Sequence, residues 1–173
     1  MQNQDYKIEI ADVMLTDHAF VLRVNEENVE MLSPMDEEML AYFLEIAELF
    51  KVIKVDGERA AFIIAIKDGV PINNPNYGVN YTWFSERYPR FLYVDRIVID
   101  EPYRRIGLGR KIYDYVEEHA REIGVPYVTC EVDTVPYNAA SLKFHEELGY
   151  VEVGTQVIRG GTVDVSMRAK AIE

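Results

Sequence analysis

The alternation of apolar and polar residues predicts a series of short strands. The segment from Tyr6 to Val13 alternates in the way typical of a half-buried strand, and Phe91 to Asp100 is a strongly apolar strand. Asp56-Gly57 and Gly160-Gly161 each separate two apolar runs and readily adopt turn conformations, so each predicts a hairpin. The predicted strands cover residues 6–13, 52–55, 60–67, 91–100, 127–133, 150–158 and 162–167.

Apolar residues that recur every three or four positions predict helices over 17–31, 33–50, 108–123 and 138–148. The second would begin at Ser33-Pro34, a capping hydroxyl followed by proline at the first helical position. Residues 68–90, rich in Pro, Asn and aromatic residues, are predicted to form a long connection. Because strands and helices interleave without a repeat or linker, we expect one domain over residues 1–173, of the α/β or α+β class.

Composition excludes several classes of protein. The 173 residues carry a net charge of −12, which argues against a nucleic-acid partner. One Cys and three scattered His exclude a disulfide framework and a Cys/His zinc cluster, so no metal is expected. Apolar stretches are shorter than the ~20 residues that span a bilayer, and the first residues lack the pattern of a signal peptide. We therefore expect a soluble, cytoplasmic protein that does not bind membranes.

One short segment has the opposite charge to the rest of the chain. Residues 104–111 carry four positive charges and no negative one, which leaves −16 on the other 165 residues. A solvated helix start is the simpler explanation, but the positive end of the helix dipole disfavours cations there. A bound phosphate group explains this local charge better.

The same segment has the pattern of an anion-binding turn. The strand 91–100 leads through Glu101-Pro102-Tyr103 into Arg104-Arg105-Ile106-Gly107-Leu108-Gly109 and then into a helix. The glycines allow close approach of the backbone, and the unpaired amides of the helix start can bind an anion. The spacing is neither that of a Walker loop nor that of a Rossmann fingerprint, which would require a third glycine.

The pattern Arg-x-x-Gly-x-Gly after a strand resembles the pyrophosphate-binding turn of the GNAT N-acetyltransferase superfamily. Residues 138–150, Asn-Ala-Ala-Ser-Leu-Lys-Phe-His-Glu-Glu-Leu-Gly-Tyr, resemble a second signature of that superfamily. The resemblance covers residues 91–158 closely and the first 67 only by element order. It is greatest to a bacterial group of predicted acetyltransferases with Phe-Leu-Tyr-Val-Asp-Arg before the turn. It implies a central mixed, mostly antiparallel, splayed sheet flanked by helices.

The resemblance also implies a cosubstrate, acetyl-CoA, and the residues that bind it. Backbone amides in the turn would bind the pyrophosphate, and Arg104 would open that turn. Main-chain groups of Ile97 and Ile99 would pair with the pantetheine arm, and the Ile97 amide would polarise the thioester carbonyl. Asn138 would contact the cofactor arm. The pyrophosphate-binding residues implied are Arg105, Gly107, Leu108, Gly109 and Arg110.

Three residues are candidates for acid–base chemistry. His145 stands where most relatives have a Tyr that serves as general acid, and it could protonate the departing thiolate. The alternative is that His145 is a helix histidine that only packs against its neighbours. Asp95 shares a strand face with Tyr93 and Ile97, which points it toward the expected cofactor. Glu131 stands where some protein N-terminal acetyltransferases have a base. For each acid the alternative is an ion pair, for instance with Arg96 or Lys143.

Residues 77–93 hold seven of the 20 aromatic residues of the chain, too many for a disordered loop. They could roof the acceptor site, with Tyr81, Trp83 and Tyr93 contacting an amine; a hydrophobic plug or a homodimer contact is the alternative. The resemblance implies direct acetyl transfer to a primary amine of a small molecule or peptide. The acidic chain would favour a cationic acceptor. The alternative function is a non-catalytic acyl-CoA-binding or regulatory module.

Overall fold

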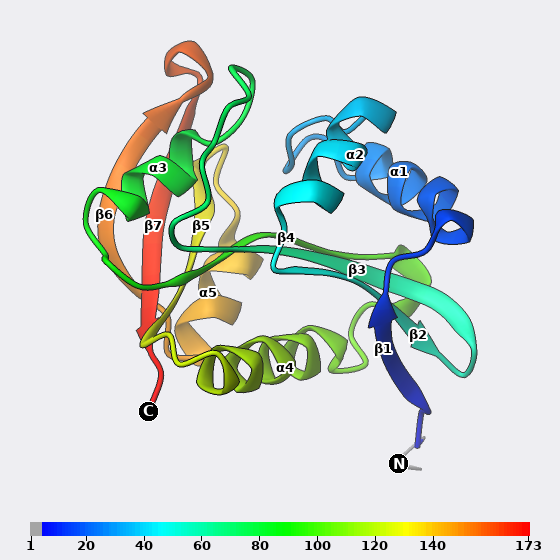
Figure 1. Ribbon diagram of the computed structural model, residues 1–173. Coiled ribbons are helices and arrows are strands. Elements are labelled where there is room, and N and C mark those ends of the chain that lie inside the picture. Colours follow the sequence, from blue (N-terminus) through cyan, green and yellow to red (C-terminus); the bar gives the residue numbers. More distant parts are fainter. Residues whose placement is uncertain (1–4) are drawn as a thin grey trace. The chain divides into compact units, whose positions relative to one another are not determined.

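The computed structural model describes residues 5–173, which form seven strands and five α-helices (Figure 1). The strand order is β1-β2-β3-β4-β5-β7-β6. β4 and β5 are parallel, whereas the pairs β1–β2, β2–β3, β5–β7 and β6–β7 are antiparallel. The strands are β1 (Ile8–Asp12), β2 (Leu49–Val55), β3 (Glu58–Lys67), β4 (Leu92–Ile99), β5 (Tyr127–Val135), β6 (Val151–Ile158) and β7 (Val163–Ala171). The predicted mixed, mostly antiparallel sheet with flanking helices is confirmed.

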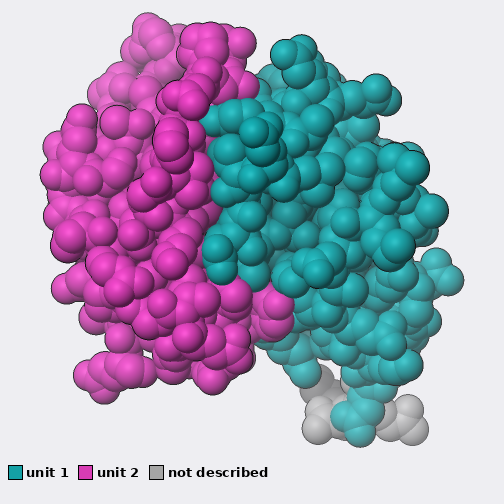
Figure 2. Space-filling model, viewed as in Figure 1, with its two compact units in different colours: residues 1–65, 96–111 teal, residues 66–95, 112–173 magenta. Residues whose placement is uncertain are grey.

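The helices are α1 (His18–Glu27), α2 (Glu37–Ile46), α3 (Val79–Ser85), α4 (Leu108–Glu122) and α5 (Ala139–Glu147). Short 3-10 turns cover Leu15–Asp17, Glu101–Tyr103 and Arg159–Gly161. None of the helices within residues 5–173 is both long enough and apolar enough to cross a membrane. The chain divides into two compact units, residues 1–65 with 96–111 and residues 66–95 with 112–173 (Figure 2). The expectation of one domain over 1–173 stays a prediction.

Three of the predicted helix boundaries are wrong. α2 ends at Ile46 rather than at residue 50, and Leu49 and Phe50 belong to β2. The cap of α2 is Asp36, whose carboxylate accepts a hydrogen bond from the Met39 amide, and not Ser33. Ser33 instead offers its carbonyl to the side chains of Asn25 and Arg96. α1 ends at Glu27 rather than at residue 31, because the Asn28 side chain bonds the Val24 carbonyl and satisfies the last turn.

The first unit holds β1, β2 and both N-terminal helices. Its core is built from apolar side chains of β2 and β3 together with α1 and α2, where Val24, Phe43 and Ile53 are fully buried. Arg96 is buried against this core: it donates to Asn25 Oδ1 at 2.8 Å and lies over the Phe43 ring. Arg96 also donates to the Ser33 carbonyl, so it joins α1 and the segment between α1 and α2 within this unit.

In the second unit, β5, β7 and β6 lie side by side (Figure 1). The side chains of β5 alternate between two faces. Cys130 shares a hydrogen bond with Tyr113 of α4, whereas its neighbour Glu131 shares one with Asn80 of α3. α3 and the part of α4 around Tyr113 therefore cover opposite faces of β5. Phe84, Phe91 and the ring of Tyr93 form the buried aromatic core beneath α3.

Candidate functional site

The turn before α4 has a backbone suited to binding an anion. Arg105 has φ +64° and Gly107 has φ +81°, both in the left-handed region. Alternating left- and right-handed residues aim successive N–H groups toward one point, forming an anion-binding nest. The Lys111 amide is the donor of a 3.4 Å bond to the Gly107 carbonyl, so the amides before it have no acceptor within the helix. The backbone therefore fits the predicted pyrophosphate.

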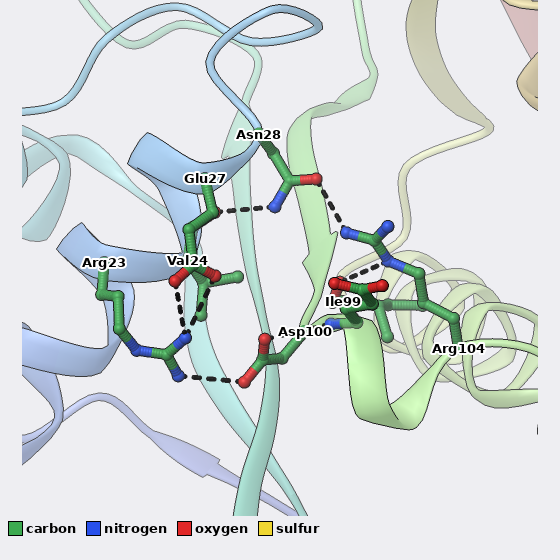
Figure 3. A network of polar contacts seen from close by, with 8 residues as sticks. Arg23, Val24, Glu27, Asn28, Ile99, Asp100 and Arg104 are labelled. Atoms are coloured by element: carbon green, nitrogen blue, oxygen red, sulfur yellow. Dashed lines mark hydrogen bonds and ion pairs between the residues drawn. The ribbon is translucent and has the colours of Figure 1, made fainter.

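Arg104 is engaged within its own unit rather than directed into the turn. Its Nε donates to the Ile99 carbonyl at 3.0 Å, and its guanidinium donates to Asn28 Oδ1 at 2.8 Å (Figure 3). In the same network Arg23 bridges Glu27 and Asp100. Arg104 thus ties the start of the turn to the ends of β4 and α1.

The predicted strand-like contacts of Ile97 and Ile99 fit the backbone of β4. The Asp100 amide donates to the Ala60 carbonyl of β3 at 2.8 Å. Because main-chain groups alternate along a strand, those of Ile97 and Ile99 point away from β3. The pairing of β4 with β5 covers Leu92 with Val128 and Tyr93 with Thr129, although β4 continues for six residues after Tyr93.

Glu131 is the chemically most unusual group of the second unit. Its Oε1 accepts a hydrogen bond from the Tyr93 hydroxyl at 2.9 Å, and Asn80 also bonds its carboxyl. The residue keeps some solvent exposure overall, but Oε2 is buried and has no hydrogen-bond partner among the described residues. Burial, reinforced by the nearby charge of Asp95, raises the pKa of the Glu131 carboxyl to about 8. A carboxyl with such a pKa can exchange a proton near neutrality.

Asp95 lies close enough to Glu131 to raise its pKa, and the two residues are called the acidic cluster below. Asp95 lies two residues after Tyr93 on β4, on the same face, and accepts a hydrogen bond from the Tyr77 hydroxyl at 2.5 Å. The charges of Asp95 and Glu131 both act on the buried Tyr93 hydroxyl, which agrees with the expected shared face of Asp95 and Tyr93. Of the two cations considered as ion-pair partners, Arg96 donates to Asn25 and Lys143 pairs with Glu147. The ion-pair alternative for the two acids stays open.

His145 lies on the other face of β5, away from Glu131. Its Nδ1 lies 2.7 Å from the Ser141 carbonyl, which can only accept, so Nδ1 carries the ring proton. Its Nε2 lies 2.7 Å from the Tyr113 hydroxyl and accepts from it. Burial lowers the pKa of His145, which favours the neutral ring. In this tautomer His145 has no proton on Nε2 to give to a thiolate.

We therefore expect His145→Phe to reduce stability more than catalysis. The change removes the ring nitrogen that accepts from the buried Tyr113 hydroxyl, at a cost of about 1–3 kcal/mol of unfolding free energy. Thermal melts and amine acetylation rates would be measured on His145→Phe, Tyr113→Phe and the double variant, and coupling between the two sites should appear in the melts. A fall of about 100-fold in kcat with an unchanged Tm would instead identify His145 as the general acid.

The predicted acceptor-site aromatics are mostly packed. Tyr81 is 3% exposed and its hydroxyl bonds the Lys67 carbonyl and the Val70 amide. The Trp83 ring lies beneath the Arg87 guanidinium, 3.9 Å away, and leaves no room for a side chain at Gly154. Asn138 caps α5 through the Ser141 amide. Tyr93 alone of the three predicted aromatics contacts the acidic cluster through its hydroxyl.

Sequence reasoning missed three residues near Glu131. Asn80 lies on α3, a helix absent from the prediction, and it also accepts a hydrogen bond from Gln156 at 2.8 Å. Tyr77 was noted only as one aromatic among seven. Asp133 lies two residues after Glu131 on the same strand face, a relation that the two-residue period of a strand could have shown.

Within residues 5–173, no group of three His, Cys, Asp or Glu side chains is placed to hold a metal ion. Cys130 is buried, and burial raises the pKa of its thiol to about 12, so it is not an activated nucleophile. The second unit holds a carboxyl, Glu131, whose pKa is raised to about 8, and the first unit holds a turn whose backbone is suited to an anion. These are the parts that acyl transfer from a phosphate-bearing donor requires.

Comparison with known proteins also indicates acyl transfer. The model of the acetyltransferase (GNAT) family matches residues 17–150. The L-ornithine N5-acetyltransferase NATA1 of Arabidopsis thaliana is 32% identical over 74 residues, which are 40% of this chain and 32% of that protein. The chain thus matches about a third of that relative's length.

Two solved structures share the fold over almost the whole chain. The ribosomal-protein-S18-alanine N-acetyltransferase from Escherichia coli has a TM-score of 0.70 at 21% identity, covering 96% of this chain and 95% of that one. Ard1 from Thermoplasma volcanium has a TM-score of 0.76 at 17% identity, covering 96% and 98%. At these identities the structures establish the fold.

Proposed function

The chain belongs to the acetyltransferase (GNAT) family, and we propose that it transfers acetyl from acetyl-CoA to a primary amine with Glu131 as the general base. The observation that carries this proposal is the buried Glu131 carboxyl, whose pKa is raised to about 8 and whose Oε2 has no partner among residues 5–173. An alkylamine has a pKa of about 10 and is mostly protonated at neutral pH. A base with a pKa near the working pH serves best to remove that proton.

In the proposed reaction both substrates are bound together. The amine nitrogen attacks the thioester carbonyl, the new C–N bond forms, and the C–S bond breaks to release CoA thiolate. Glu131 takes the proton that the amine loses, directly or through one water, and the thiolate is protonated from solvent. The buried, inert thiol of Cys130 supports direct transfer without an acyl-enzyme.

The amides of residues 105–110 would hold the pyrophosphate of acetyl-CoA, as the conformations of Arg105 and Gly107 favour. The main-chain groups of Ile97 and Ile99 would pair with the pantetheine arm, and the Ile97 amide would polarise the thioester carbonyl. Asn138 would contact the same arm. Acetyl-CoA supplies the acyl group, and these residues bind and orient it.

The acceptor is proposed to be a small-molecule or peptide amine that arrives as a cation. The net charge of −12 favours such an acceptor, because it raises the local concentration of cations. The names of the relatives, an L-ornithine N5-acetyltransferase and a ribosomal-protein-S18-alanine N-acetyltransferase, show that both kinds of amine occur among similar proteins.

The test is the release of thiol from acetyl-CoA in the presence of an amine panel that contains ornithine, diamines, alkylamines and short peptides with a free N-terminus. We expect thiol release that depends on the amine, with the acetylated amine formed in equal amount. Binding of acetyl-CoA without turnover of any amine would support a non-catalytic acyl-CoA-binding module and overturn the proposal.

A further inference from the structure

Within residues 5–173, three buried polar atoms on one face of β5 have no hydrogen-bond partner. Thr129, Glu131 and Asp133 are alternate residues of this strand and therefore share the face covered by α3. Among the described residues, Thr129 Oγ1, Glu131 Oε2 and Asp133 Oδ2 are buried and have no hydrogen-bond partner, and Thr129 is 0% exposed. Buried polar atoms in folded proteins are normally satisfied, so this row indicates a place for a polar ligand.

The chemistry of the row defines the ligand. When ionised, the carboxylates of Glu131 and Asp133 accept hydrogen bonds only, and the negative charge of Asp95 acts on Glu131. The ligand must therefore donate hydrogen bonds and carry positive charge, as an ammonium group does. One cation of the protein, Arg159, acts on Asp133, so the acids outnumber the cations that influence the row.

The spacing of the two carboxyl groups in the row suggests that the ligand carries two positive charges. Same-face neighbours on a strand have Cα atoms about 6.6 Å apart, so two charges of a ligand at that spacing match Glu131 and Asp133. Consistent with this spacing, no group of three acidic, His or Cys side chains within residues 5–173 is placed to hold a metal. The two nitrogens of an extended four-carbon diamine are separated by a similar distance. A dication of that length would satisfy both carboxylates at once.

We propose that the acceptor is a short aliphatic diamine, whose reacting amine lies at Glu131 while its second ammonium is bound by Asp133. This inference rests on the proposed function and adds to it the substrate class and a specificity-determining residue. Asp133 does not take part in proton transfer. It binds the second ammonium equally in the ground state and the transition state, so it should act on KM rather than on kcat.

The experiment compares 1,4-diaminobutane with n-butylamine, which has the same chain length but one charge, by release of thiol from acetyl-CoA. We expect kcat/KM for the diamine to exceed that for the monoamine by about 10- to 100-fold, the effect of one charged hydrogen bond. Asp133→Asn should raise KM for the diamine by a similar factor, leave its kcat unchanged, and leave n-butylamine unaffected. Asp114→Asn, an exposed acid on α4, is the matched control for net charge.

The outcomes separate the two proposals. Equal kcat/KM for the two amines, or an equal loss for both in Asp133→Asn, would overturn the diamine inference and leave the acetyltransferase activity in place. Turnover restricted to peptide amines would also overturn it. Absence of thiol release with every amine would overturn the proposed function itself, and the inference with it. Circular dichroism of Asp133→Asn verifies that the variant is folded.

Discussion

Replacing Glu131 by Gln should lower kcat for amine acetylation by about 10²–10⁴-fold, the usual contribution of a general base. Glutamine has nearly the same shape and can still accept from the Tyr93 hydroxyl, so the change removes proton acceptance and little else. The affinity for acetyl-CoA should stay within about twofold of the parent. Steady-state rates by thiol release, with calorimetry for acetyl-CoA, check both statements.

The pH dependence of the rate of the parent enzyme should follow the ionisation of Glu131. Glu131 acts as a base only when ionised, so kcat/KM should rise with pH up to about 8, where its raised pKa lies, and Glu131→Gln should lose that limb. Stability follows the opposite trend. Because the folded state holds the Glu131 proton to higher pH than the unfolded chain does, its contribution to stability falls as pH rises from about 4.3 to about 8. Glu131→Gln should therefore melt at a higher temperature than the parent at pH 9, which excludes unfolding as the reason for lost activity.

Replacing either of two neighbours of Glu131 should shift the rising limb of the pH profile of kcat/KM, and the two shifts should be opposite. Asp95→Asn removes a negative charge that raises the pKa of Glu131, so the limb should shift to lower pH. Tyr93→Phe removes a hydrogen bond that lowers the pKa of Glu131, so the limb should shift to higher pH. Full activity of Glu131→Gln across the pH range, or a limb that neither neighbour moves, would remove Glu131 from the chemistry.

The sequence predicted the parts of the fold whose pattern is local and strong. The alternation over residues 91–100 and the helical spacing over 108–123 agree with β4 and α4 to within one or two residues. α3 was missed because its sequence, Val-Asn-Tyr-Thr-Trp-Phe-Ser, has β-branched and aromatic residues with weak helix propensity. Its helical form rests on burial of Tyr81 and Phe84, a tertiary effect that periodicity does not record.

In the candidate site, too, the features set by local sequence could be predicted and those set by tertiary contacts could not. The conformation of the turn at Gly107 follows from its glycines and could be predicted. The hydrogen bond between Glu131 and the Tyr93 hydroxyl depends on which strands pair, here β4 with β5, and no local pattern gives that pairing. The engagement of both ring nitrogens of His145 likewise depends on Tyr113, which is 32 residues away in the chain. A motif could place His145 on its helix but could not say what the ring contacts.

Replacing Gly107 by Asp should reduce the affinity for CoA by at least about 100-fold. The backbone of Gly107 has φ +81°, where side chains are strained, and the new carboxylate would place a negative charge in the turn that the pyrophosphate requires. A Cβ at Gly107 meets no atom within 4 Å, so the effect is not a steric clash with the protein. Isothermal titration with CoA measures the loss.

Gly69→Asp is the matched control, because Gly69 has φ +79° and likewise no atom within 4 Å of an added Cβ. It carries the same strain and charge away from the turn, so it should cost similar stability and leave CoA affinity unchanged. Gly107→Ala, which adds strain without charge, should fall between the parent and Gly107→Asp. S-acetylpantetheine lacks the pyrophosphate, so its turnover should be the same in Gly107→Asp as in the parent. If Gly107→Asp binds CoA as tightly as Gly69→Asp does, the pyrophosphate is not held by this turn.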